Sequence, residues 1–99
     1  MIQRRSELRA NRIDREWPHQ VAVPADPIMG RNSTIIAEFC RGLSLCPRRH
    51  TVQRDDVTYH VFCFVDAAHV ERFRARFGGE PFDPKDRGRG SAWFVWRKR

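Results

Sequence analysis

The stretch VTYHVFCFVDAAHVERFRARFGG, residues 57–79, decides the fold because it predicts a strand, a helix cap and an amphipathic helix in succession. Residues 57–65 alternate two rows of mainly apolar and aromatic side chains, as a central strand does. Asp66 is a residue type that caps helix N-termini. The helix that follows carries apolar residues at helical spacing and ends in a glycine pair, Val70, Phe73, Phe77, Gly78 and Gly79.

The flanking sequence predicts four further elements. Three strands are expected at residues 17–23, 50–54 and 92–96, and the turn Asp55-Asp56 makes a hairpin of the middle one with residues 57–65. A helix capped by Asn32 or Ser33 carries the apolar stripe Ile35, Ile36, Phe39, Cys40 and Leu43. The order strand, helix, strand, strand, helix, strand predicts an α+β, ferredoxin-like β-α-β-β-α-β sandwich, with a four-stranded antiparallel sheet and two helices on one face.

The length of 99 residues leaves room for one domain with a modest core. Residues 1–16 are polar and rich in arginine, so we expect a flexible basic N-terminal arm there and a single domain over residues 17–99. No apolar run is long enough for a membrane-spanning helix, and the first residues lack the apolar core of a secretory signal. We therefore expect a cytoplasmic protein that does not bind membranes.

The three cysteines, Cys40, Cys46 and Cys63, are an odd number without dense spacing. This pattern suits a reducing compartment rather than a disulfide scaffold. We expect each cysteine to be a small buried hydrophobic residue.

The formal net charge of +7 favours an acidic partner. Residues 85–99 carry six basic side chains against the single acid Asp86, which gives this end a net charge of +5. Phosphate groups of a nucleic acid are the commonest ligands of such a surface.

The run Val61, Phe62, Cys63, Phe64, followed by Val65 and Asp66, resembles the third strand of the RNA-recognition motif family, and the order of elements agrees over residues 17–97. The resemblance implies an open sheet face on which bases stack. The family's two exposed aromatic positions map to Tyr59 and Val61, and the first strand has no stacking aromatic. The chain is also similar to short proteins of alphaproteobacterial genomes, a likeness that implies no function.

RNA or single-stranded DNA is therefore the favoured partner, held by stacking and by phosphate contacts. The candidate site residues are Tyr59, Trp93, Trp96, Arg87, Arg89, Arg97, Lys98 and Arg99. The alternative is a protein-interaction or assembly subunit, with a homodimer included, in which the same aromatic face meets an acidic partner or a second copy.

Neither a metal centre nor an enzyme is favoured by the spacing of histidines and cysteines. A zinc site made from Cys46, His50, His60 and Cys63 is disfavoured because residues 60 and 63 of one strand face opposite ways. A small ribonuclease would use His50 or His60 with Arg48 or Arg49. No motif requires that chemistry, so we expect no cofactor and no catalytic residues.

Overall fold

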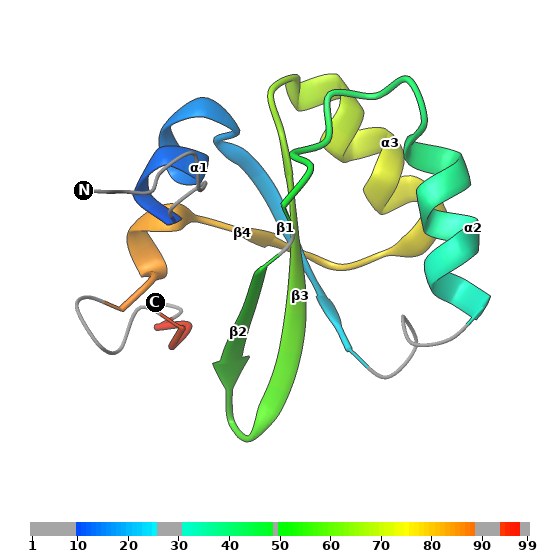
Figure 1. Cartoon of the computed structure of the whole chain (residues 1–99). Coiled ribbons are helices and arrows are strands. Elements are labelled where there is room, and N and C mark those ends of the chain that lie inside the picture. The colour runs from blue at the N-terminus through cyan, green and yellow to red at the C-terminus, as the bar shows by residue number, and fades with distance from the viewer. Residues whose placement is uncertain (1–9, 26–30, 49, 89–93, 98–99) are drawn as a thin grey trace, which may run out of the picture.

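The structure is a computed structural model that describes residues 10–25, 31–48, 50–88 and 94–97. Within these ranges a four-stranded antiparallel sheet is combined with three α-helices (Figure 1). The elements are α1 (Ala10–Glu16), β1 (His19–Pro24), α2 (Arg31–Cys40), β2 (His50–Arg54), β3 (Val57–Phe64), α3 (Ala67–Phe77) and β4 (Glu80–Phe82). The predicted α+β class is confirmed. None of the described helices is long and apolar enough to cross a membrane.

Strands β3 and β1 lie at the centre of the sheet, whose order is β2-β3-β1-β4. Each neighbouring pair is antiparallel, with Ala22 opposite Val61 and Val52 opposite Tyr59. The predicted hairpin is present, since β2 and β3 are joined by Asp55 and Asp56. Both aspartates have positive φ angles, 54° and 65°, as the favoured two-residue hairpin turn requires.

Helices α2 and α3 cover one face of the sheet, which we call the helical face (Figure 1). Its core is buried and contains Val21, Val23, Ile36, Cys40, Phe62, Phe64, Val70 and Phe73. The predicted cap of α3 is confirmed, because the Asp66 carboxylate accepts a hydrogen bond from the N–H of Ala68. At the other end the N–H of Gly78 donates to the carbonyl of Arg74.

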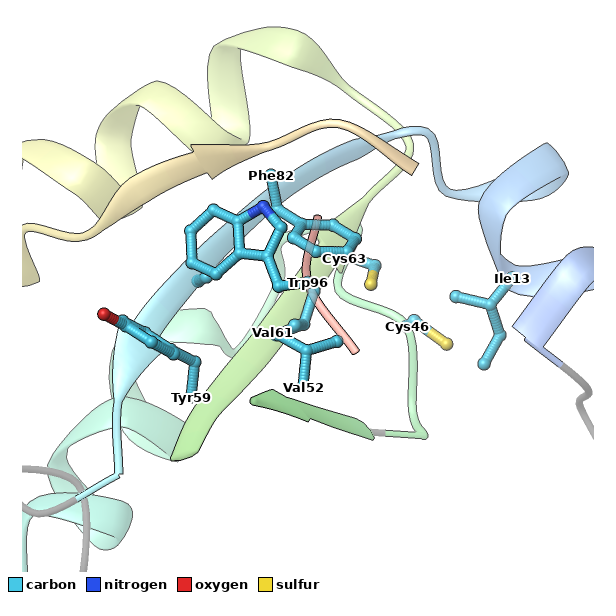
Figure 2. Close-up of a cluster of buried hydrophobic side chains, with 9 residues drawn as sticks. Ile13, Cys46, Val52, Tyr59, Val61, Cys63, Phe82 and Trp96 are labelled. Atoms are coloured by element: carbon cyan, nitrogen blue, oxygen red, sulfur yellow. The ribbon is translucent and has the colours of Figure 1, made fainter. Parts of the chain in front are cut away.

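The opposite face, which we call the second face, is also covered. Helix α1 and the C-terminal segment of residues 94–97 lie on this side of the sheet (Figure 1). Its core consists of Ile13, Ala22, Cys46, Val52, Tyr59, Val61, Cys63, Phe82 and Trp96, and most of these are drawn in Figure 2. The sheet is thus enclosed on both sides by parts of its own chain.

The fourth strand differs from its predicted position. The prediction placed it at residues 92–96, but β4 is Glu80–Phe82, directly after the glycine pair that ends α3. Of the apolar run, only residues 94–96 lie within the described part, and these form two isolated bridges, Val95 with Gln53 and Trp96 with Arg87. Of these described residues Trp96 packs in the second-face core, and none of the three extends the four-stranded sheet.

The N-terminal arm also differs from the prediction over residues 10–16. These residues form α1, and its Ile13 is only 2% exposed in the second-face core. One apolar side chain on a short polar helix creates no amphipathic pattern, although it is enough to hold the helix against the sheet. Residues 1–9 lie outside the described part of the chain.

Candidate functional site

The two described aromatic residues predicted to stack on bases are buried in the second face. Tyr59 is 8% exposed and Trp96 is 3% exposed. Their rings meet edge to face with centroids 5.0 Å apart, and Trp96 also contacts the ring of Phe82 (Figure 2). In this arrangement both rings form the interior of the molecule, and neither offers a face to a base.

Arg54 seals the edge of this aromatic cluster. Its guanidinium lies 4.0 Å from the centre of the Trp96 ring, a cation–π distance. It also donates hydrogen bonds to the Tyr59 hydroxyl at 3.2 Å and to a Glu80 carboxylate oxygen at 2.7 Å. The hydrogen bond to Glu80 is the main reason why the pKa of Arg54 is raised. These contacts join the C-terminal segment to β2, β3 and β4.

Arg87, a predicted phosphate ligand, is turned inward. Its side chain is only 6% exposed, and two of its nitrogens donate to the two oxygens of Asp14 at 3.1 and 3.2 Å. The amide of Gln20 donates to the same carboxylate at 3.0 Å. A guanidinium held in this way is not available to a phosphate, so Arg87 supports the fold by holding α1 on the sheet.

The remaining predicted residues divide into one described residue and four that are not described. The side chain of Arg97 is exposed, and its backbone N–H donates to the carbonyl of Asp86 at 2.7 Å. The other four, Trp93, Arg89, Lys98 and Arg99, lie outside the described residues. Of the predicted site residues, the structure therefore brings Tyr59, Trp96 and Arg87 together. They are buried parts of the fold and do not form a binding surface.

His50 and Cys63 form a polar contact beside the Arg87–Asp14 ion pair. His50 Nε2 lies 3.3 Å from Cys63 Sγ and 3.5 Å from a nitrogen of Arg87. Burial and then the Arg87 charge lower the pKa of His50 to about 4, against an opposing effect of Asp14. Burial and then the proximity of Cys46 raise the pKa of the Cys63 thiol. A neutral imidazole beside a protonated thiol is not an activated nucleophile, because the thiolate is the reactive form.

The two histidines considered for catalysis face opposite sides of the sheet. His50 is opposite Val61 in the hairpin and shares the second face with Cys63, whereas His60 alternates with them. The predicted separation of His60 and Cys63 is thus confirmed. Within the described ranges no group of three histidine, cysteine or acidic side chains is arranged to hold a metal ion. His50 and His60 are therefore not placed to act together as an acid–base pair.

Ser44 is a residue that sequence reasoning missed. Its hydroxyl oxygen accepts hydrogen bonds from the backbone N–H groups of Val65 and Asp66, each at 3.1 Å, and lies 2.8 Å from Nδ1 of His69. His69 Nε2 is 3.7 Å from the Asp66 carboxylate. This order of groups resembles a hydrolase triad, but two backbone donors already occupy the hydroxyl oxygen. The group fixes the junction between β3 and α3.

Arg72 and Arg76 lie on the solvent side of α3, one helical turn apart, and both are exposed. The nearest acid on the helix, Glu71, pairs instead with Arg74 at 3.1 Å. Within the described residues neither Arg72 nor Arg76 forms an ion pair with a carboxylate. We call these two side chains the α3 arginine pair. Like charges at this spacing repel, so their juxtaposition weakens the helix slightly unless an anion lies between them.

Comparisons with known proteins identify no relative of this chain. No protein-family model matches the chain, and no curated protein or solved structure is similar enough to count as a match. A function is therefore proposed from the geometry and the charge of the chain itself.

Proposed function

We propose that the protein binds a polyanion, nucleic acid foremost, through exposed guanidinium groups rather than by stacking bases on its sheet. The observation that carries this proposal is the α3 arginine pair, two exposed cations with no carboxylate partner among the described residues. The net charge of +7 supplies the long-range attraction that brings such a partner to the surface.

The α3 arginine pair suits a phosphate backbone in both chemistry and spacing. Side chains one turn apart on a helix lie roughly 5–6 Å apart at Cβ, and arginine tips extend well beyond that. Each guanidinium offers several planar donors that match phosphate oxygens. Neutralising two neighbouring phosphates releases their condensed counterions, which is the main source of nonspecific affinity for nucleic acid.

Burial of Tyr59 and Trp96 restricts the manner of binding. Sequence-tolerant single-strand binders gain much of their affinity from bases stacked on exposed aromatic rings. With both rings inside the second-face core, affinity must come from the phosphate backbone instead. A backbone-based mode accepts both duplex and single-stranded polymers and has little sequence preference.

We also propose that the fold is ferredoxin-like. Support comes from the strand order β2-β3-β1-β4, from the two strand–helix–strand units and from the position of α2 and α3 on one face. Helix α1 and residues 94–97 would then be additions that close the face left open in simpler forms of this architecture. An experimentally determined structure with the same strand order would support this assignment, and another order would reject it.

The test is a binding titration with fluorescently labelled duplex DNA and single-stranded RNA of equal length. In the Arg72→Gln/Arg76→Gln variant the affinity for both polymers should fall on the order of tenfold, because two phosphate contacts are lost. The matched control is Arg12→Gln/Arg41→Gln, which removes the same charge from two arginines that are already paired with Glu16 and Glu38. Its affinity should remain close to that of the unchanged protein.

Equal loss in both variants would show that only net charge matters and would reject the α3 arginine pair as the contact surface. If the protein bound neither the duplex DNA nor the single-stranded RNA at low salt, nucleic acid would be rejected as the partner. The basic surface would then be assigned to an acidic protein partner, to be sought with the same two variants.

A further inference from the structure

Cys46 and Cys63 lie directly opposite each other in neighbouring strand-like segments. Leu45 and Phe64 form an antiparallel bridge, so the next residues along, Cys46 and Cys63, are also in register. The N–H of Cys46 donates to the carbonyl of Cys63 at 2.8 Å, and the N–H of Val65 donates to the carbonyl of Ser44 at 3.2 Å, which fixes this register on both sides.

The two side chains also share a face. Both belong to the second-face core, and Figure 2 shows them next to one another, Cys63 on β3 and Cys46 on the segment before β2. Directly opposed residues in antiparallel segments have Cα atoms about 4.5–5.5 Å apart. This is inside the range of about 4.4–6.8 Å that a disulfide spans, so the backbone separation permits a bond between them.

A cavity borders the residues of this cysteine pair. It has a volume of about 120 Å³ and is lined by both cysteines together with exposed residues, Ala37, Pro47 and Arg48 among them. A space of this size admits a few water-sized molecules. The same cavity touches Ile36 and Phe62 of the helical-face core, whereas the cysteines are 3% and 1% exposed in the second-face core, so an oxidant reaches the sulfurs when the chain beside this cavity opens locally.

We propose that Cys46 and Cys63 are a redox modification site that closes an intramolecular disulfide on exposure to hydrogen peroxide. Cys46 sulfur attacks the peroxide O–O bond and becomes a sulfenic acid; the released hydroxide takes the thiol proton and forms water. Cys63 sulfur then attacks the Cys46 sulfur, and the sulfenic hydroxyl leaves as a second water with the Cys63 proton. Two electrons pass from the two thiols to the peroxide.

The surroundings distinguish the roles of the two sulfurs. Burial raises the pKa of the Cys46 thiol, and the backbone N–H and charge of the exposed Arg48, two residues further on, oppose part of this rise. Cys63 lies deeper, and His50 Nε2 at 3.3 Å is placed to accept its proton. Cys46 is thus the attacking residue and Cys63 the resolving one. Cys40 belongs to the helical face and is excluded from the pair.

Peptide mapping after peroxide treatment of the native protein tests the site directly. Trypsin cleaves after arginine, which places Cys40, Cys46 and Cys63 in three separate peptides, residues 32–41, 42–48 and 55–72. We expect an intact mass lower by two hydrogens, one remaining free thiol, and a cross-linked species joining 42–48 to 55–72. The oxidised protein should also unfold at a higher temperature, and dithiothreitol should reverse both changes.

Two variants complete the test. Cys40→Ala should still form the bond, whereas Cys46→Ala should lose the intramolecular mass change while keeping its fold, checked by circular dichroism. Three free thiols after treatment, a cross-link that includes Cys40, or oxidation of Cys46 without a cross-link would each overturn the proposal. If Cys46→Ala does not fold, the peptide map of the unchanged protein still decides the matter.

Discussion

The ion pair between Arg87 and Asp14 joins side chains 73 positions apart in the sequence. The side chains are 6% and 18% exposed, and both oxygens of the carboxylate are used. Pairs of this kind are costly to break singly, because the remaining charge stays buried without compensation. This contact links α1 to the segment that follows β4.

Removing the carboxylate should therefore destabilise the fold far more than removing an exposed one. We expect Asp14→Ala to lower the free energy of unfolding by about 3–5 kcal/mol, measured by urea denaturation. Glu16→Ala is the matched control, since Glu16 pairs with Arg12 at the surface, and it should cost less than about 1 kcal/mol. Similar losses in both variants would contradict a structural role for the Arg87–Asp14 pair.

His50 should make stability depend on pH. Its pKa is lowered to about 4 in the folded state, chiefly by burial and then by the Arg87 charge, against an ordinary value of 6.5. Between pH 6.5 and pH 4 the unfolded chain therefore binds a proton at His50 that the folded chain does not bind. The free energy of unfolding consequently falls as the pH falls through this range. Cys63 and Asp14 are the other polar groups near the ring.

The measurement is the free energy of unfolding at pH 6.5 and at pH 5, above the range in which most carboxylates titrate. The unchanged protein should lose stability over this interval, and the His50→Gln variant should lose clearly less. An identical loss in the two proteins would show that His50 is not the group responsible.

At the scale of the elements, the junction between α3 and β4 depends on Gly79. Its φ angle is +107°, and an added Cβ would lie 2.7 Å from a methyl carbon of Val21 and 3.0 Å from the carbonyl oxygen of Ala22. Backbone strain and a collision with β1 would then act together. The close approach lets the chain pass from α3 into the edge strand within two residues.

The Gly79→Ala variant should lose about 3 kcal/mol or more of unfolding free energy. Gly78→Ala provides the control, because Gly78 also has a positive φ angle, +81°, but nothing lies within 4 Å of an added Cβ. With a ψ angle of −154° Gly78 lies in a backbone region that is essentially limited to glycine, so the variant should cost about 1–3 kcal/mol from backbone strain alone. If thermal or urea denaturation gave equal losses, close packing against β1 would be excluded as the cause.

The elements that could be predicted from sequence are those with local signals. The alternation of β3, the Asp66 cap and the glycine stop of α3 all reside within one stretch, and the structure places them there. Strand β4 has no such signal, because its three residues include Pro81, which an edge strand tolerates. The apolar run after residue 91 has the stronger strand pattern, although in its described part Trp96 packs on the second face instead.

At the scale of the whole molecule, the second face is closed by groups that are far apart in sequence. Trp96 and Ile13 reach the same core from opposite ends of the described chain. Neither position can be inferred from periodicity, since α1 carries one buried apolar residue and the C-terminal segment forms only isolated bridges. For the same reason the sequence could suggest Tyr59 as a binding residue but not that Trp96 covers it.

Removing the Trp96 side chain, which covers the second face, should destabilise the fold. Trp96→Ala should reduce the free energy of unfolding by about 3–5 kcal/mol, because a large side chain in contact with Tyr59 and Phe82 is removed. Phe94→Ala is the control, as Phe94 is 42% exposed, and it should cost less than about 1 kcal/mol. A small effect of Trp96→Ala in urea denaturation would mean that the second face is open in solution.

The salt dependence of binding to duplex DNA tests the proposed function most directly. The logarithm of the affinity should fall linearly with the logarithm of the salt concentration. For Arg72→Gln/Arg76→Gln the slope should be less steep by about 1.8, corresponding to two lost phosphate contacts. The Arg12→Gln/Arg41→Gln control should keep the original slope. Equal slopes in all three proteins, or binding that does not respond to salt, would contradict phosphate recognition by the α3 arginine pair.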